Sequence, residues 1–72
     1  MSISWKIKHH EESNDIIKLL TRYKKMWAMV DYKNQNKFDF AMSKIDKLEE
    51  EIKSKYPFLN HYSNLVEIAY LI

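Results

Sequence analysis

A stripe of apolar side chains in the second half of the chain constrains the fold more than any other feature. Between residues 38 and 56 the apolar positions recur at intervals of three and four: Phe38, Ala41, Ile45, Leu48, Ile52 and Tyr56. In an α-helix these positions fall within an arc of about 80°, and the charged residues lie on the other side. So narrow an arc needs a partner helix with a matching stripe. The pattern therefore predicts a helix over about 37–56 that packs against a second helix.

A matching stripe precedes this segment. Its apolar positions have the same spacing: Ile16, Leu20, Tyr23, Trp27 and Val30. They predict a helix over about 14–32, with Ser13 or Asn14 as its N-cap. The three residues Asn34 to Asn36 favour a turn, and an asparagine among them caps the next helix, with Asp39 at N3 if that cap is Asn36. We therefore expect an antiparallel helical hairpin. One long helix over 14–56 is the alternative, and it would break the spacing of the stripe.

The two ends of the chain are harder to interpret. Residues 2–8 alternate Ile3, Trp5 and Ile7 with polar side chains, which is the pattern of a half-buried strand, so we expect an extended N-terminal arm. Residues 65–72 are apolar on nearly every side, and they predict a short helix, capped by Asn60 or Ser63, or else a strand that pairs with the arm. The expected fold is a single all-α domain over residues 1–72.

The size of the chain limits its stability. A domain of 72 residues has a small core, which supplies only about 3–5 kcal/mol unless disulfides, a metal or association adds to it. The chain has no cysteine, yet 46% of its residues are hydrophobic. We therefore expect a homo-oligomer, or a complex with a larger protein.

The absence of two residue types excludes several activities. Phosphate-binding loops, dinucleotide fingerprints and nucleophile elbows need glycine for close backbone approach or for positive φ, and the chain has none. Without cysteine there is no thiol catalysis and no thiolate metal site. We therefore expect a protein that is not an enzyme and that needs no cofactor.

The one cluster that resembles a metal site lies before the first predicted helix. It comprises His9, His10 and Glu12, with His61 as a conceivable third imidazole. The simpler interpretation is a solvated segment whose carboxylates favour the positive end of the following helix. We therefore expect no metal here.

A basic stripe runs along the first predicted helix. Lys18, Arg22 and Lys25 follow one another at i, i+4 and i+7, so they share a face. Such a stripe suits phosphate groups or an acidic partner, and a solvated helix face is the plainer alternative. The net charge is only +2, which provides little field for recruiting nucleic acid.

Three large apolar side chains lie close to the predicted turn and off the stripes. Met29, Tyr32 and Phe40 are candidates for contact with a partner protein. The alternative for Phe40 is that its ring caps the end of the helix pair.

Composition suggests a setting for this function. No apolar run is long enough for a signal peptide or a membrane span, so we expect a cytoplasmic protein with no membrane contact. Phe, Tyr, Met, Ile, Asn and Lys, which have A/T-rich codons, make up 36 of the 72 residues. We expect a small interaction protein, such as a phage or mobile-element inhibitor or regulator of a host protein. The alternative is a dimeric nucleic-acid-binding regulator that uses the basic stripe.

Overall fold

The computed structural model describes residues 2–61 and 64–72, and within these ranges the chain is all-α, as predicted. Its elements are α1 (Ile3–Lys8), α2 (Ser13–Ala28), α3 (Gln35–Lys55), the short 3-10 helix η1 (Pro57–His61) and α4 (Leu65–Leu71). No helix of the described part is long and apolar enough to cross a membrane.

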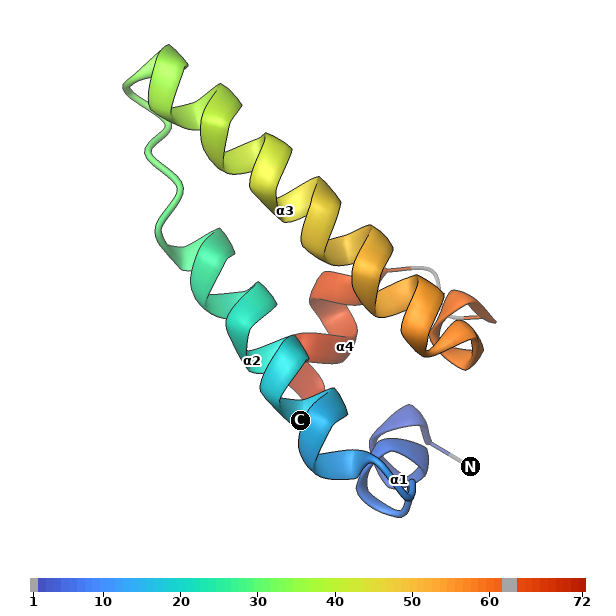
Figure 1. Cartoon of the computed structure of the whole chain (residues 1–72). Coiled ribbons are helices and arrows are strands. Elements are labelled where there is room, and N and C mark those ends of the chain that lie inside the picture. Colours follow the sequence, from blue (N-terminus) through green and yellow to red (C-terminus); the bar gives the residue numbers. More distant parts are fainter. Residues whose placement is uncertain (1, 62–63) are drawn as a thin grey trace.

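The two longest helices, α2 and α3, form the frame of the molecule. Figure 1 shows them running in opposite directions, with residues 29–34 joining them at one end. The core between them contains the middle of both predicted stripes: Ile16, Leu20 and Tyr23 from α2, and Ile45, Leu48 and Ile52 from α3. Phe38 is only partly buried, because α3 continues past the core toward the turn. We call this end, where residues 29–40 lie, the turn end.

The turn differs in detail from the prediction. Helix α2 ends at Ala28 and not near residue 32. The Asp31 carboxylate accepts a hydrogen bond of 3.0 Å from the backbone N–H of Lys33, and such a local turn competes with helix. The cap of α3 is Asn34, one of the two asparagines of the predicted turn, since its side chain accepts a hydrogen bond of 3.2 Å from the N–H of Lys37.

The N-terminal segment corrects a prediction. The expected extended arm is wrong, because residues 3–8 form helix α1. The Ser2 hydroxyl accepts a hydrogen bond of 3.2 Å from the N–H of Trp5 and so caps the helix. Ile3 and Ile7, one helical turn apart, are both buried, while Trp5 is 48% exposed. Helix α1 packs on α2 and α4.

The C-terminal segment adopts the helical alternative and forms α4. Its cap is Asn64, whose side chain accepts a bond of 2.9 Å from the N–H of Val66. Of the two predicted caps, Asn60 lies in η1, and Ser63 lies outside the described residues. Helix α4 buries Leu65, Ile68 and Ala69, and it packs on α2 and α1.

The start of α2 also differs from the prediction. Neither Ser13 nor Asn14 caps the helix, because its N-cap is Glu12, which makes no capping bond with its side chain. The Glu12 backbone N–H instead donates a hydrogen bond of 3.0 Å to Nδ1 of His10.

Candidate functional site

The most exposed large apolar side chains lie at the turn end. Met29 is 81% exposed, Tyr32 is 73% exposed and Phe40 is 64% exposed. An aromatic ring this exposed does not cap the end of the helix pair, which was the alternative for Phe40. The ring is instead approached by Lys44, whose Nζ lies 4.6 Å from the ring centroid in a cation–π contact.

Two grooves flank the α2–α3 contact, and of the three candidate partner-binding residues only Tyr32 lines one of them; Met29 lines neither. The first, the basic groove, is lined by Arg22, Met26, Lys44, Lys47, Leu48 and Glu51. The second, the aromatic groove, is lined by Tyr23, Trp27, Tyr32, Val66 and Tyr70, with Glu49 and Asn64. Tyr32 belongs to the aromatic groove, whereas Phe40 adjoins the basic groove through Lys44.

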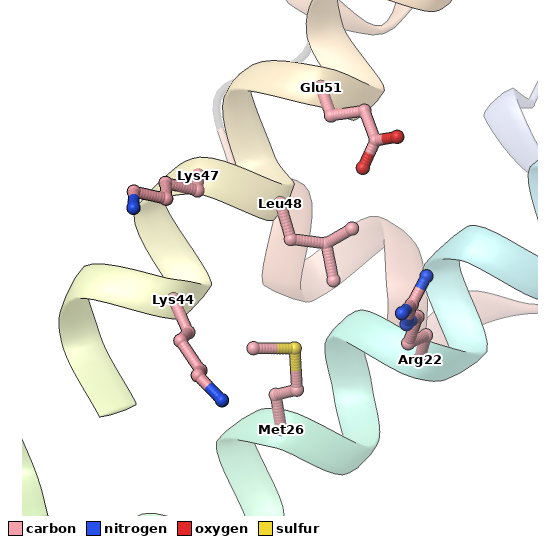
Figure 2. A pocket seen from close by; sticks show the side chains of 6 residues that line it. All are labelled: Arg22, Met26, Lys44, Lys47, Leu48 and Glu51. Atoms are coloured by element: carbon pink, nitrogen blue, oxygen red, sulfur yellow. The ribbon is translucent and has the colours of Figure 1, made fainter. Parts of the chain in front are cut away.

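The basic groove has an apolar floor and charged walls. Figure 2 shows Leu48 of α3 pointing toward Met26 of α2, so these two side chains meet between the helices. Arg22 and Glu51 point toward one another beside them, and Lys44 reaches down toward α2. Lys47 points away from α2, into solvent. The result is a strip of apolar surface bordered mainly by cations.

The structure brings the three predicted basic residues together. Lys18, Arg22 and Lys25 line one shallow hollow on α2, and Arg22 also belongs to the basic groove. The hollow and the groove therefore form one continuous surface, which we call the basic face: Lys18, Arg22, Lys25, Lys44 and Lys47. Within the described parts of the chain, none of these five cations forms an ion pair within 4.0 Å.

Sequence reasoning missed the contribution of α3 to this face. Phe40, Lys44 and Lys47 follow one another at i, i+4 and i+7, the same spacing that identified the stripe on α2. This spacing was visible in the sequence. Only the packing of α3 on α2, however, shows that Lys44 and Lys47 lie on the same side as Arg22.

The overall charge of +2 conceals a strong asymmetry. The basic face carries five cations, and Glu51 is the one carboxylate that lines its groove, which gives it a charge of +4. The remaining seven cations and nine carboxylates of the chain give −2. The electrostatic potential at a surface depends on how the charges are distributed, so the net charge of the whole chain underestimates the attraction of the basic face for anions.

One residue of the aromatic groove, Trp27, carries a buried polar atom. Trp27 Nε1 is buried, and it forms no hydrogen bond within 3.5 Å among the described residues. Beside it, the Tyr23 hydroxyl donates a hydrogen bond of 3.3 Å to a Glu49 carboxylate oxygen. Burial raises the pKa of the Tyr23 hydroxyl above its ordinary value.

The histidines near the N-terminus make local contacts. His9 Nδ1 lies 3.0 Å from the backbone oxygen of Trp5, and the His9 ring stacks on the Trp5 ring. The His10 ring stacks on Phe58 with 5.3 Å between ring centroids. His61 lies at the end of η1. Across residues 2–61 and 64–72, no group of three acidic, histidine or cysteine side chains is placed to hold a metal ion.

Comparisons with known proteins give no indication of function, so the functional argument depends on the surface of this molecule. The chain matches no protein-family model, no curated protein and no solved structure. Two surfaces therefore remain as candidates: the apolar side chains of the turn end and the basic face.

Proposed function

We propose that this protein is a small, non-enzymatic docking module that binds another protein through the turn end of α2 and α3. The observation that carries the proposal is the exposure of Met29, Tyr32 and Phe40. Three large apolar side chains at one end of a 72-residue chain stay in contact with water unless a partner covers them. Aromatic residues and methionine are also enriched at protein interfaces.

The surface area of the molecule supports this proposal. The accessible surface is 5327 Å², whereas a compact monomer of 8.8 kDa exposes about 4,800 Å² by the usual scaling. The molecule measures 40 × 21 × 20 Å, and α3 extends past the core toward the turn. A standard interface covers about 800 Å² on each partner, so an elongated end of this kind offers suitable surface.

The composition supports a setting for the proposed function. The high share of residues with A/T-rich codons suits a phage or another mobile element, in which small docking proteins act by inhibiting or regulating a host protein.

A dimeric nucleic-acid-binding regulator is the second candidate, and one observation favours it. Lys44 and Lys47 join Lys18, Arg22 and Lys25 on the basic face, which makes a more concentrated site for phosphates than α2 alone. Phosphate contacts give no role to the exposed Met29 side chain, and for that reason we rank this function second.

The test begins with the capture of a partner. The purified protein is immobilised, exposed to a lysate of its host cell, and the retained proteins are identified by mass spectrometry. The affinity of the purified partner is then measured for the wild type and for three variants: Met29→Ala, Phe40→Ala and Trp5→Ala. The last is a control, because Trp5 is also exposed but lies on α1.

We expect Met29→Ala and Phe40→Ala each to weaken binding by more than about 1 kcal/mol, because both side chains gain contacts only in the complex. Trp5→Ala should leave binding unchanged. Retention of nucleic acid alone, or equal affinities for all three variants, would contradict the proposal.

A further inference from the structure

The floor of the basic groove suits the apolar side chains of a helix. Leu48 is only 6% exposed and Met26 is partly buried, and the two meet between α2 and α3. Side chains from a third helix insert into such a depression between two packed helices. The flexible thioether of Met26 adapts to side chains of different shapes.

The walls of the groove select for negative charge. Arg22, Lys44 and Lys47 line it, and the basic face continues along α2. Since none of these cations has an ion-pair partner within 4.0 Å among the described residues, each is available to a carboxylate of a binding partner.

The groove is continuous with the turn end. Lys44 lines the groove and also contacts the Phe40 ring at 4.6 Å. Met29, the C-cap of α2, donates a backbone hydrogen bond of 3.2 Å to the carbonyl of Lys25, a residue of the basic face. We infer that the basic groove binds an acidic amphipathic helix of the partner protein, with its apolar side chains over Met26 and Leu48 and its carboxylates against the cations. The inference rests on the proposed function and specifies the chemistry of the partner.

The chemistry of the groove favours a protein segment over nucleic acid. A phosphate backbone would contact the cations but would leave the apolar floor of Met26 and Leu48 unused. Binding of single strands also relies on aromatic faces on which bases stack. The Phe40 ring adjoins the groove, and Lys44 Nζ lies over one of its two faces.

The test uses a library of short random peptides displayed on phage and selected on the immobilised protein. Enriched peptides are synthesised, and their affinities are measured by fluorescence anisotropy for the wild type and two double variants. Lys44→Glu with Lys47→Glu reverses charge in the groove. The matched control is Lys6→Glu with Lys8→Glu, which makes the same change in net charge on α1, a helix that lines no part of the groove. Circular dichroism checks that both variants are folded.

We expect the enriched peptides to combine Asp and Glu with large apolar residues at i, i+3 or i+4, and i+7. The groove variant should weaken their binding by about tenfold or more, and the control variant should change it far less. Phe40→Ala should also weaken binding, because this ring lies beside the groove.

Several results would overturn the inference: no enriched peptide, enriched peptides that are neutral or basic, or affinities that the groove variant leaves unchanged. Tighter binding of DNA or RNA of matching length, lost in the groove variant, would assign the groove to nucleic acid. Self-association of the wild type that the groove variant abolishes would assign it to a second copy of the chain. If peptides bind and respond to Phe40→Ala but not to the groove variant, the docking function stands and only this inference fails.

Discussion

The hydroxyl of Tyr56, which follows the last residue of α3, donates a hydrogen bond to the carboxylate of Asp15 in the first turn of α2. Lys55 Nζ lies 2.8 Å from the same carboxylate, and a Glu12 carboxylate oxygen lies 2.7 Å from the hydroxyl. Because the hydroxyl has a single proton, it donates to one carboxylate at a time. These contacts join the two long helices at the end opposite the turn, so they hold the frame that presents both grooves.

The first prediction concerns the pH dependence of this contact. Hydrogen bonds from Lys55 and Tyr56 lower the pKa of Asp15 below its ordinary value of 3.8. Since the folded pKa lies below the unfolded one, the contribution of Asp15 to stability is present at neutral pH. It is lost as the pH falls below about 4 and through the folded pKa.

We therefore expect Asp15→Asn to melt at a lower temperature than the wild type at pH 7, because the carboxylate no longer binds Lys55. The two melting temperatures should converge at acid pH, where the wild-type carboxylate is protonated as well. Thermal melts followed by circular dichroism across the acid range measure both. Parallel curves for the two proteins would show that this carboxylate contributes nothing specific.

The second prediction concerns the core. Ile45 lies in the middle of the α3 stripe and is fully buried, so Ile45→Ala should destabilise the fold by about 2–5 kcal/mol. That is a large part of the stability of a small domain. Lys47→Ala, on the exposed side of α3, should cost almost nothing. Chemical denaturation measures the free energy of unfolding of both variants. Equal decreases in this free energy would mean that the α3 stripe does not face the core.

The helices of the frame were predictable because their apolar residues repeat over several turns. The short ends were not. Ile3, Trp5 and Ile7 fit a strand by alternation, yet Ile3 and Ile7 are also four residues apart, which is the spacing of one helix face. A segment of six residues is too short for periodicity to decide between the two. The Ser2 cap and the burial of both isoleucines against α2 and α4 favour helix, and those contacts exist only in the folded chain.

The candidate site was predictable from residues on a single helix but not from residues on two. Lys18, Arg22 and Lys25 share a face of α2 through spacing alone. Their continuation across α3 depends on the rotation of α3 about its axis, which places Lys44 and Lys47 on the side of Arg22 and Glu49 on the other. Counting charges along the sequence does not show which side of the helix pair each charged residue of α3 occupies.

The third prediction is self-association. Helix α4 buries Leu65, Ile68 and Ala69 within the chain, but Tyr70 remains 61% exposed and Leu71 remains 63% exposed. We expect sedimentation equilibrium at micromolar concentration to show a dimer or a higher species, because a domain this small gains stability by covering such residues. Leu71→Glu should shift the equilibrium toward monomer. A wild type that is monomeric and thermally stable would contradict this prediction.

The fourth prediction concerns metal. His10 Nδ1 accepts a backbone hydrogen bond from Glu12, and His9 Nδ1 contacts the Trp5 carbonyl, so these ring nitrogens are engaged locally. Addition of Zn²⁺ or of EDTA should leave the melting temperature unchanged, since a ligand that binds the folded state raises it. A rise of several degrees with one equivalent of metal would show that the cluster binds a metal after all.

The most direct test of the docking function compares the affinity for the captured partner protein with the affinity for DNA and RNA of random sequence, each at two salt concentrations. We predict that the partner binds more tightly than either nucleic acid at physiological salt, and that Phe40→Ala weakens the partner complex. Tight nucleic-acid binding would contradict the docking function if the logarithm of the binding constant fell steeply as the logarithm of the salt concentration rose. The contradiction would be complete if the triple variant Lys18→Ala, Arg22→Ala and Lys25→Ala abolished that binding and reduced the slope by about one unit for each cation removed.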